Sequence, residues 1–141
     1  MDNELYQEVL LQHSKRPKNF GPLEPETHSA EGHNALCGDE IRVALLVKDG
    51  KLAEVKFTGA SCAICTASAS IMTDEVKGLP TESARKLAGT FRKLARCGKA
   101  PGVSERLRVL ESVYLFPQRV KCAVLPWETL VSALPDPVGV G

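Results

Sequence analysis

The sequence predicts a single domain of mixed helix and sheet, built from one antiparallel β-hairpin and several helices. Two short runs of strand-like residues, 41–47 and 52–58, are joined by a Lys-Asp-Gly-Lys turn that is typical of a hairpin. Apolar residues at helical spacing occur before and after this hairpin. The chain has 141 residues, of which 43% are hydrophobic and 5% aromatic, so we expect one domain with an aliphatic core.

Charge and hydropathy argue against several classes of protein. The net charge is +1 with 25% charged residues, which gives no reason to expect nucleic acid or an anionic membrane as a partner. No apolar run approaches the roughly 20 residues that span a bilayer, and the first residues lack the features of a signal peptide. We therefore expect a cytoplasmic protein whose residues 1–141 form one domain, with a loose tail from about residue 135.

The helical segments are recognised by their spacing and by their start and stop residues. They comprise residues 4–14, 63–77, a helix that begins at Thr81, a short segment at 106–113 and a last helix that begins at Pro117. Proline removes a backbone donor, so Pro126 is expected to kink or divide the last helix. In residues 52–57 of the hairpin, Leu52 is expected on the face opposite Val55 and Phe57.

Five cysteines offer most of the chemistry: Cys37, Cys62, Cys65, Cys97 and Cys122. An odd count without an export signal argues against a disulfide framework. In a reducing compartment, such residues are small buried side chains, metal ligands or reactive thiols. Cys62 stands between a predicted strand and a predicted helix, where the positive end of the helix dipole favours its thiolate.

The hairpin predicts which residues Cys62 meets. Cys37 lies just before the first strand and Cys62 just after the second, so an antiparallel pair brings both to the same end of the sheet. Cys37 and Asp39 are two residues apart and point the same way in an extended chain, and Gly38 lets the backbone between them bend. We expect two thiols and a carboxylate near one point.

Two other patterns allow competing interpretations. Cys62 and Cys65 have the C-x-x-C spacing of a redox pair or of half a zinc site, but the redox motif requires a βαβ context and here a hairpin precedes it. The H-x-E and P-C-x-x-C motifs of a zinc deaminase are absent. His28 and His33, in a polar segment, are five residues apart, which suits neither a strand face nor a helix face. We expect both histidines at the surface.

A wider set fits a metal site better. Cys37, Asp39, Cys62 and Cys122 offer three thiolates and one carboxylate, the number of ligands that tetrahedral zinc takes. Thiolates also hold iron–sulfur clusters. The carboxylate is a hard oxygen ligand that is more easily displaced than a fourth thiolate, so this set suits a site that hands over its contents.

Short motifs follow one another in a specific order: Lys15-Arg16-Pro17-Lys18-Asn19 with Gly21, Cys37-Gly38-Asp39, Cys62 followed by Ala67-Ser68-Ala69-Ser70, Lys77-Gly78 and Val120-Lys121-Cys122. In these motifs, over about residues 4–134, the chain resembles the U-type iron–sulfur cluster assembly scaffolds, the SufU and IscU proteins. It is more similar to the SufU branch, in Phe116-Pro117, in Trp127 and in an extra segment at about 91–108. The IscU branch has a histidine where this chain has Lys121.

The resemblance implies an α+β fold, with a small three-stranded antiparallel sheet and helices packed on one side. It implies a metal site for zinc or a transient [2Fe–2S] cluster, made by Cys37, Asp39, Cys62 and Cys122. The implied partners are a cysteine desulfurase of the SufS or IscS type, which passes sulfur as a persulfide, and downstream cluster acceptor proteins. Cys122 is implied as the persulfide acceptor, and Arg119 as a residue that helps to orient the site.

We therefore expect an iron–sulfur cluster assembly scaffold or carrier. One alternative is a zinc-dependent sulfurtransferase that activates the desulfurase without carrying a cluster. Another is a structural zinc module, against which the placement of the ligands at loop ends argues. Cys65 is expected either as a spare thiol of the site or as a packed residue, Cys97 matches no motif, and Lys121 could pair with Asp39 when no metal is bound.

Overall fold

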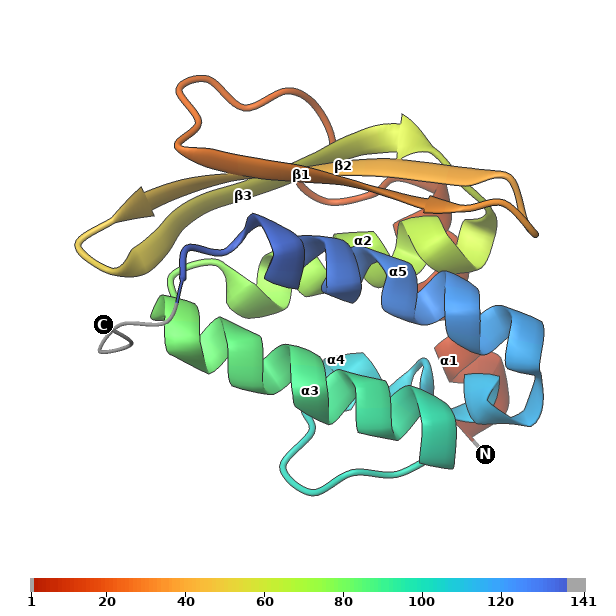
Figure 1. The fold of residues 1–141 in the computed structure, drawn as a ribbon. Helices are drawn as coiled ribbons and strands as arrows, with labels where there is room; N and C mark the ends of the chain where they lie inside the picture. The colour runs from red at the N-terminus through yellow and green to blue at the C-terminus, as the bar shows by residue number, and fades with distance from the viewer. Residues whose placement is uncertain (1, 137–141) are drawn as a thin grey trace.

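A computed structural model describes residues 2–136 of the chain, so residues 137–141 of the predicted loose tail lie outside the described part. The elements are α1 (Asp2–Lys15), β1 (His28–Asn34), β2 (Asp39–Lys48), β3 (Lys51–Ala60), α2 (Ala63–Val76), α3 (Thr81–Cys97), α4 (Glu105–Arg108), the 3-10 helix η1 (Glu111–Leu115) and α5 (Pro117–Ala133). The strands form one antiparallel sheet in the order β1-β2-β3, and Figure 1 shows the helices gathered on one face of it. The predicted α+β fold with a three-stranded sheet is confirmed.

The β2–β3 hairpin has the predicted turn and one unpredicted irregularity. Asp49 and Gly50 both have positive φ, 53° and 74°, as a type I′ turn requires. Farther along, the register shifts so that Ala53 has no partner on β2. This bulge places Leu52 in the core together with Val55 and Phe57. The expectation that Leu52 lies on the opposite face is wrong because strict alternation does not survive an inserted residue.

The first strand is the polar segment that contains both histidines. Its residues are alternately half-buried and exposed, but the half-buried positions are small or polar, so they give no apolar strand pattern. Gly32 lies directly against Thr129 of α5 and leaves no room for a Cβ, so the helix packs closely on β1. His33 is exposed and His28 is half-buried.

Two helices, α2 and α5, lie against the sheet, and α3 packs on α5 on the side away from it (Figure 1). The core is mainly aliphatic, as predicted, with Trp127 stacked on Phe91 at a centroid distance of 4.8 Å. Pro126 lies inside α5, which runs through it as one helix. Of the two predicted outcomes, a kink or a division, the division does not occur, because burial of α5 between the sheet and α3 outweighs one missing backbone hydrogen bond.

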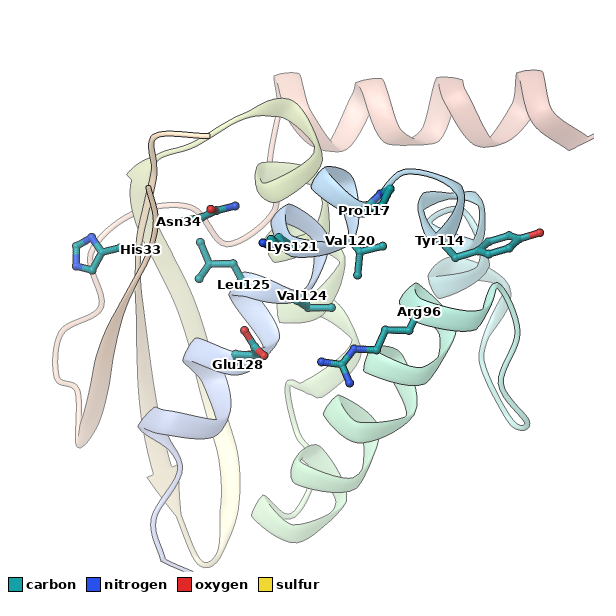
Figure 2. Close-up of a pocket in the computed structure, with 10 residues that line it drawn as sticks. All are labelled: His33, Asn34, Arg96, Tyr114, Pro117, Val120, Lys121, Val124, Leu125 and Glu128. Atoms are coloured by element: carbon teal, nitrogen blue, oxygen red, sulfur yellow. The ribbon is translucent and has the colours of Figure 1, made fainter. Parts of the chain in front are cut away.

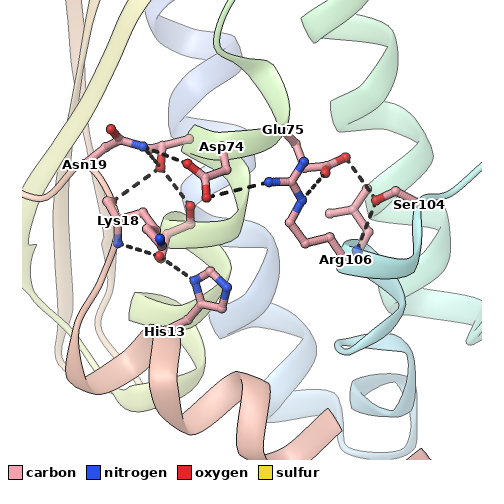
Figure 3. Close-up of polar contacts among 10 residues, drawn as sticks. His13, Lys18, Asn19, Asp74, Glu75, Ser104 and Arg106 are labelled. Carbon is pink, nitrogen blue, oxygen red and sulfur yellow. Dashed lines mark hydrogen bonds and ion pairs between the residues drawn. The ribbon is translucent and has the colours of Figure 1, made fainter. Parts of the chain in front are cut away.

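The segment after α1 is fixed to α2 by polar contacts, which Figure 3 shows. Ser70 Oγ lies 2.7 Å from His13 Nδ1 and accepts the backbone N–H of Lys18 at 2.7 Å. Asn19 donates to Thr73 Oγ1 at 2.9 Å and to Asp74 at 3.1 Å. Within the described residues, no helix combines the length and the apolar character that crossing a bilayer requires.

Candidate metal centre

The predicted ligands come from three places in the fold. Cys37 lies in the turn between β1 and β2, and Asp39 is the first residue of β2. Cys62 follows β3 and precedes α2, and Cys122 lies in the second turn of α5. The antiparallel register places the start of β2 beside the end of β3, and α5 packs across β1 and β2. This packing brings Cys122 to the same end of the sheet.

Three of the four residues form a tight group. The ligand atoms of Cys37, Asp39 and Cys122 all lie within 4.8 Å of one another, and Cys122 Sγ is 3.1 Å from Cys37 Sγ. Asp39 and Cys122 are buried, with 1% and 4% exposure, whereas Cys37 is exposed. The group is therefore open to solvent on the side of the β1–β2 turn.

Cys62 borders this group without belonging to it. Its backbone N–H donates to Asp39 Oδ1 at 2.8 Å, and its Sγ lies 3.9 Å from Asp39 Oδ2. The same sulfur caps α2 by accepting the N–H of Cys65 at 3.4 Å. Cys62 thus lies at the predicted end of the hairpin. Its sulfur, however, contacts both the Asp39 carboxylate and the first turn of α2.

The buried Asp39 carboxylate has no cationic partner among residues 2–136. Lys121 is exposed and makes no ion pair with it, so the expected Lys121–Asp39 pair does not form in this structure. A buried carboxylate without a countercharge is costly. Beside three thiols, it fits the donor set of a zinc ion, which takes sulfur and carboxylate ligands together.

Burial changes the acidity of two thiols. It raises the pKa of Cys122, and hydrogen bonds with Cys37, Cys62 and Asp39 act in the same direction. Without a cation, Cys122 is therefore a neutral thiol at pH 7. Burial also raises the pKa of Cys65 to about 12. A thiol must be deprotonated to bind a metal ion. Cys122 must therefore release its proton when a metal ion binds.

Arg119, predicted to orient the site, and Cys97, which matches no motif, both lie apart from the group, and one contact was not predicted. The Arg119 guanidinium stacks over the Phe116 ring at 4.4 Å, and no described hydrogen bond or ion pair joins it to the site. Cys97 is exposed at the end of α3. Asn34 Nδ2 lies 3.8 Å from Cys122 Sγ. No sequence pattern indicates Asn34, because its approach to Cys122 depends on strand β1, which was not predicted.

A cavity of about 510 Å³ adjoins this site (Figure 2). It lies between α5, the end of α3, η1 and the end of β1, and Asn34 and Lys121 are on its side nearest Cys122. Figure 2 shows Arg96 extending from α3 toward α5 and Glu128 lying on α5, whereas His33 points away. None of the four predicted ligands lines the cavity.

Comparison with known proteins supports a family assignment. The model of the family described as "NifU-like N terminal domain" matches residues 5–136 of this chain. The chain is 37% identical to an iron–sulfur cluster assembly scaffold protein IscU of Streptococcus pyogenes, over 94% of this chain and 84% of that protein. It is 36% identical to the zinc-dependent sulfurtransferase SufU of Bacillus subtilis, over 89% and 86%. A solved structure of a proposed SUF-system scaffold protein from Fervidobacterium islandicum has a TM-score of 0.85 at 32% identity, over 96% and 100%.

Proposed function

Because the chain belongs to the NifU-like N-terminal domain family, we propose that it is an iron–sulfur cluster assembly protein that receives sulfur from a cysteine desulfurase. The observation that carries this proposal is the group of Cys37, Asp39 and Cys122, whose ligand atoms lie within 4.8 Å of one another at a solvent-facing turn. Together with Cys62, this group has side chains that can bind iron or zinc and thiols that can accept sulfur. The assembled cluster then passes to downstream acceptor proteins.

Sulfur arrives as a persulfide, and Cys122 is its proposed acceptor. Once it has lost its thiol proton, Cys122 attacks the outer sulfur of the partner's persulfide, the partner's sulfur–sulfur bond breaks, and the partner cysteine leaves as a thiolate. Cys122 is buried behind Cys37, with 3.1 Å between the two sulfurs. The partner must therefore displace the exposed turn that contains Cys37 before it reaches Cys122.

Exposed apolar side chains around the site suit a protein partner. Leu36, next to Cys37, is 72% exposed, and Leu115 and Phe116, just before α5, are 59% and 47% exposed. Apolar side chains at a protein surface favour contact with another protein. Here they flank the turn and the helix that carry the thiols, so a desulfurase that docks on them would cover the site.

The residues that would hold a metal are Cys37, Asp39, Cys62 and Cys122. When bound, a zinc ion would keep the thiols deprotonated at neutral pH. Its replacement by iron and sulfide is favoured by the weakest of the four donors, the carboxylate. We propose zinc for the isolated protein and a transient [2Fe–2S] cluster as the product.

A second candidate is a zinc-dependent sulfurtransferase that activates the desulfurase and carries no cluster. The similarity to the Bacillus subtilis SufU protein favours it. In that case, Cys122 accepts sulfur in the same way but passes it directly to another protein. A structural zinc module fits less well, because a closed site would not leave Cys37 exposed.

One experiment separates the two candidates. The chain is mixed anaerobically with a cysteine desulfurase, cysteine and ferrous iron, and visible cluster absorption is followed beside the rate of sulfide release. An assembly scaffold gives both a visible cluster and faster sulfide release. Faster sulfide release without a cluster would refute the scaffold role and favour sulfur transfer. If the chain changes neither quantity, the proposed function is wrong.

A further inference from the structure

Cys65 lies beside the candidate centre but takes no part in the function proposed above. It is fully buried in the first turn of α2, and its backbone N–H donates to Cys62 Sγ at 3.4 Å. Cys62 is half-buried at the start of the same helix. The βαβ context of the redox motif is absent, but the C-x-x-C spacing still places an accessible thiol and a buried thiol together at a helix start, as in dithiol redox pairs.

We propose that Cys65 is a resolving thiol, which converts a persulfide on Cys62 into free sulfide and leaves a Cys62–Cys65 disulfide. This inference rests on the proposed function, because that function brings persulfide sulfur to these thiols. The persulfide forms on Cys62 directly, or by transfer from Cys122, since both residues border the Asp39 carboxylate.

The step balances without an added oxidant: Cys62–S–SH and Cys65–SH give Cys62–S–S–Cys65 and H₂S. The Cys65 sulfur attacks Cys62 Sγ, and the sulfur–sulfur bond of the persulfide breaks. The outer sulfur leaves with that electron pair, and it takes up the proton of the Cys65 thiol. The outer sulfur is thereby reduced by two electrons, and the two cysteine sulfurs are oxidised to a disulfide. A dithiol reductant then reopens the pair.

The geometry selects the inner sulfur as the point of attack. Cys62 Sγ is held at the start of α2 by the Cys65 N–H at 3.4 Å, so both cysteines lie at the same end of the helix. The outer sulfur of a persulfide on Cys62 would have no such anchor. Because Cys65 is fully buried, external reagents do not reach it, and it meets only sulfur that is already bound to its neighbour.

The product is what cluster assembly requires. A persulfide carries sulfur at the oxidation level of the element, whereas a cluster contains sulfide. Resolution by Cys65 supplies sulfide a few ångströms from Asp39, since Cys62 Sγ lies 3.9 Å from Asp39 Oδ2. While the disulfide persists, Cys62 is also withdrawn from the metal ligands, so each turnover requires the dithiol reductant.

The test uses the full chain, reduced, freed of metal by a chelator and treated anaerobically with sodium tetrasulfide as the persulfide donor. After desalting, samples are alkylated at intervals and digested with trypsin, which releases residues 57–77 with both cysteines in one peptide. We expect this peptide to pass from the persulfide to an internal disulfide while sulfide appears in equal amount. In Cys65→Ser, the Cys62 persulfide should decay at least about ten-fold more slowly.

Equal lifetimes of the Cys62 persulfide in the wild type and in Cys65→Ser would overturn the inference. So would a disulfide between Cys37 and Cys122 while both cysteines of the 57–77 peptide remain reduced. Cys65→Ala serves as a second variant, and circular dichroism confirms that both variants are folded. Cys97→Ser, which removes an exposed thiol at the end of α3, should behave as the wild type. No desulfurase is present, so failure of the proposed function in the desulfurase assay remains distinguishable from failure here.

Discussion

Ser68 joins the two helices that carry the buried thiols, and we predict that Ser68→Ala destabilises the protein. Ser68 lies on α2 and donates to the Ala123 carbonyl of α5 at 2.6 Å. It also accepts the Trp127 Nε1–H at 3.2 Å. All three residues are at most 1% exposed. The substitution removes both bonds and leaves the indole N–H buried without a partner.

The size of the effect follows from that orphaned donor. Leaving one buried polar group unsatisfied costs about 1–3 kcal/mol, so we expect a loss of about 2 kcal/mol in the free energy of unfolding. This corresponds to a roughly 30-fold larger unfolding constant, since about 1.4 kcal/mol is ten-fold. For a chain of this length the Tm should fall by roughly 6–8 °C.

Trp127 is the single tryptophan, so its fluorescence reports urea unfolding from the affected contact itself. The matched control is Ser132→Ala, which removes an exposed hydroxyl from the same helix, α5, and should leave the midpoint unchanged. A loss below about 0.5 kcal/mol for Ser68→Ala, the range of an ordinary surface substitution, would refute the role of this hydrogen-bonded link.

Three further predictions concern the thiols and one histidine. Cys37→Ser and Cys122→Ser, like Cys62→Ser, should each lower the zinc bound per chain, measured by atomic absorption, whereas Cys97→Ser should not; equal zinc in all variants would refute the ligand assignment. Burial lowers the pKa of His13 below 6.5 despite Asp74, so the unfolded chain binds the proton more readily, and stability should fall as the pH drops from 7.5 to 5.5. In His13→Gln the urea midpoint should depend less on pH, and an unchanged dependence would contradict this assignment. Exposed Cys37 and Cys97 should react rapidly with Ellman's reagent. Cys65, whose pKa burial raises to about 12, should react only after unfolding. If a further thiol reacts rapidly in the wild type and this reaction is lost in Cys65→Ser, Cys65 is not buried.

The structure departs from sequence-based expectation where burial, rather than local pattern, decides the conformation. The segment 28–34 becomes strand β1 because α5 covers it, although its inward residues include Gly32 and Asn34 beside Ala30 and no large apolar side chain. Pro126 remains inside one helix for the same reason. The bulge at Ala53 moves Leu52 into the core, since hydrophobic burial outweighs strict alternation.

Local residues are sufficient to predict the hairpin and the residues that meet at its end. The Asp49-Gly50 turn and the strand pattern require that residues just before β2 and just after β3 meet, which brings Asp39 to the backbone of Cys62. These are short-range consequences of backbone geometry, so local residues suffice to predict them.

The position of Cys122 beside these residues depends instead on packing between distant segments. Cys122 lies 85 residues from Cys37 in the chain, and the 3.1 Å between their sulfurs depends on α5 packing against β1, β2 and α2. That packing is set by contacts such as Gly32 against Thr129 and by the bonds of Ser68, none of which a periodicity shows. Side-chain packing between distant segments depends on shape and burial, whereas sequence patterns specify only which face of each element is turned inward.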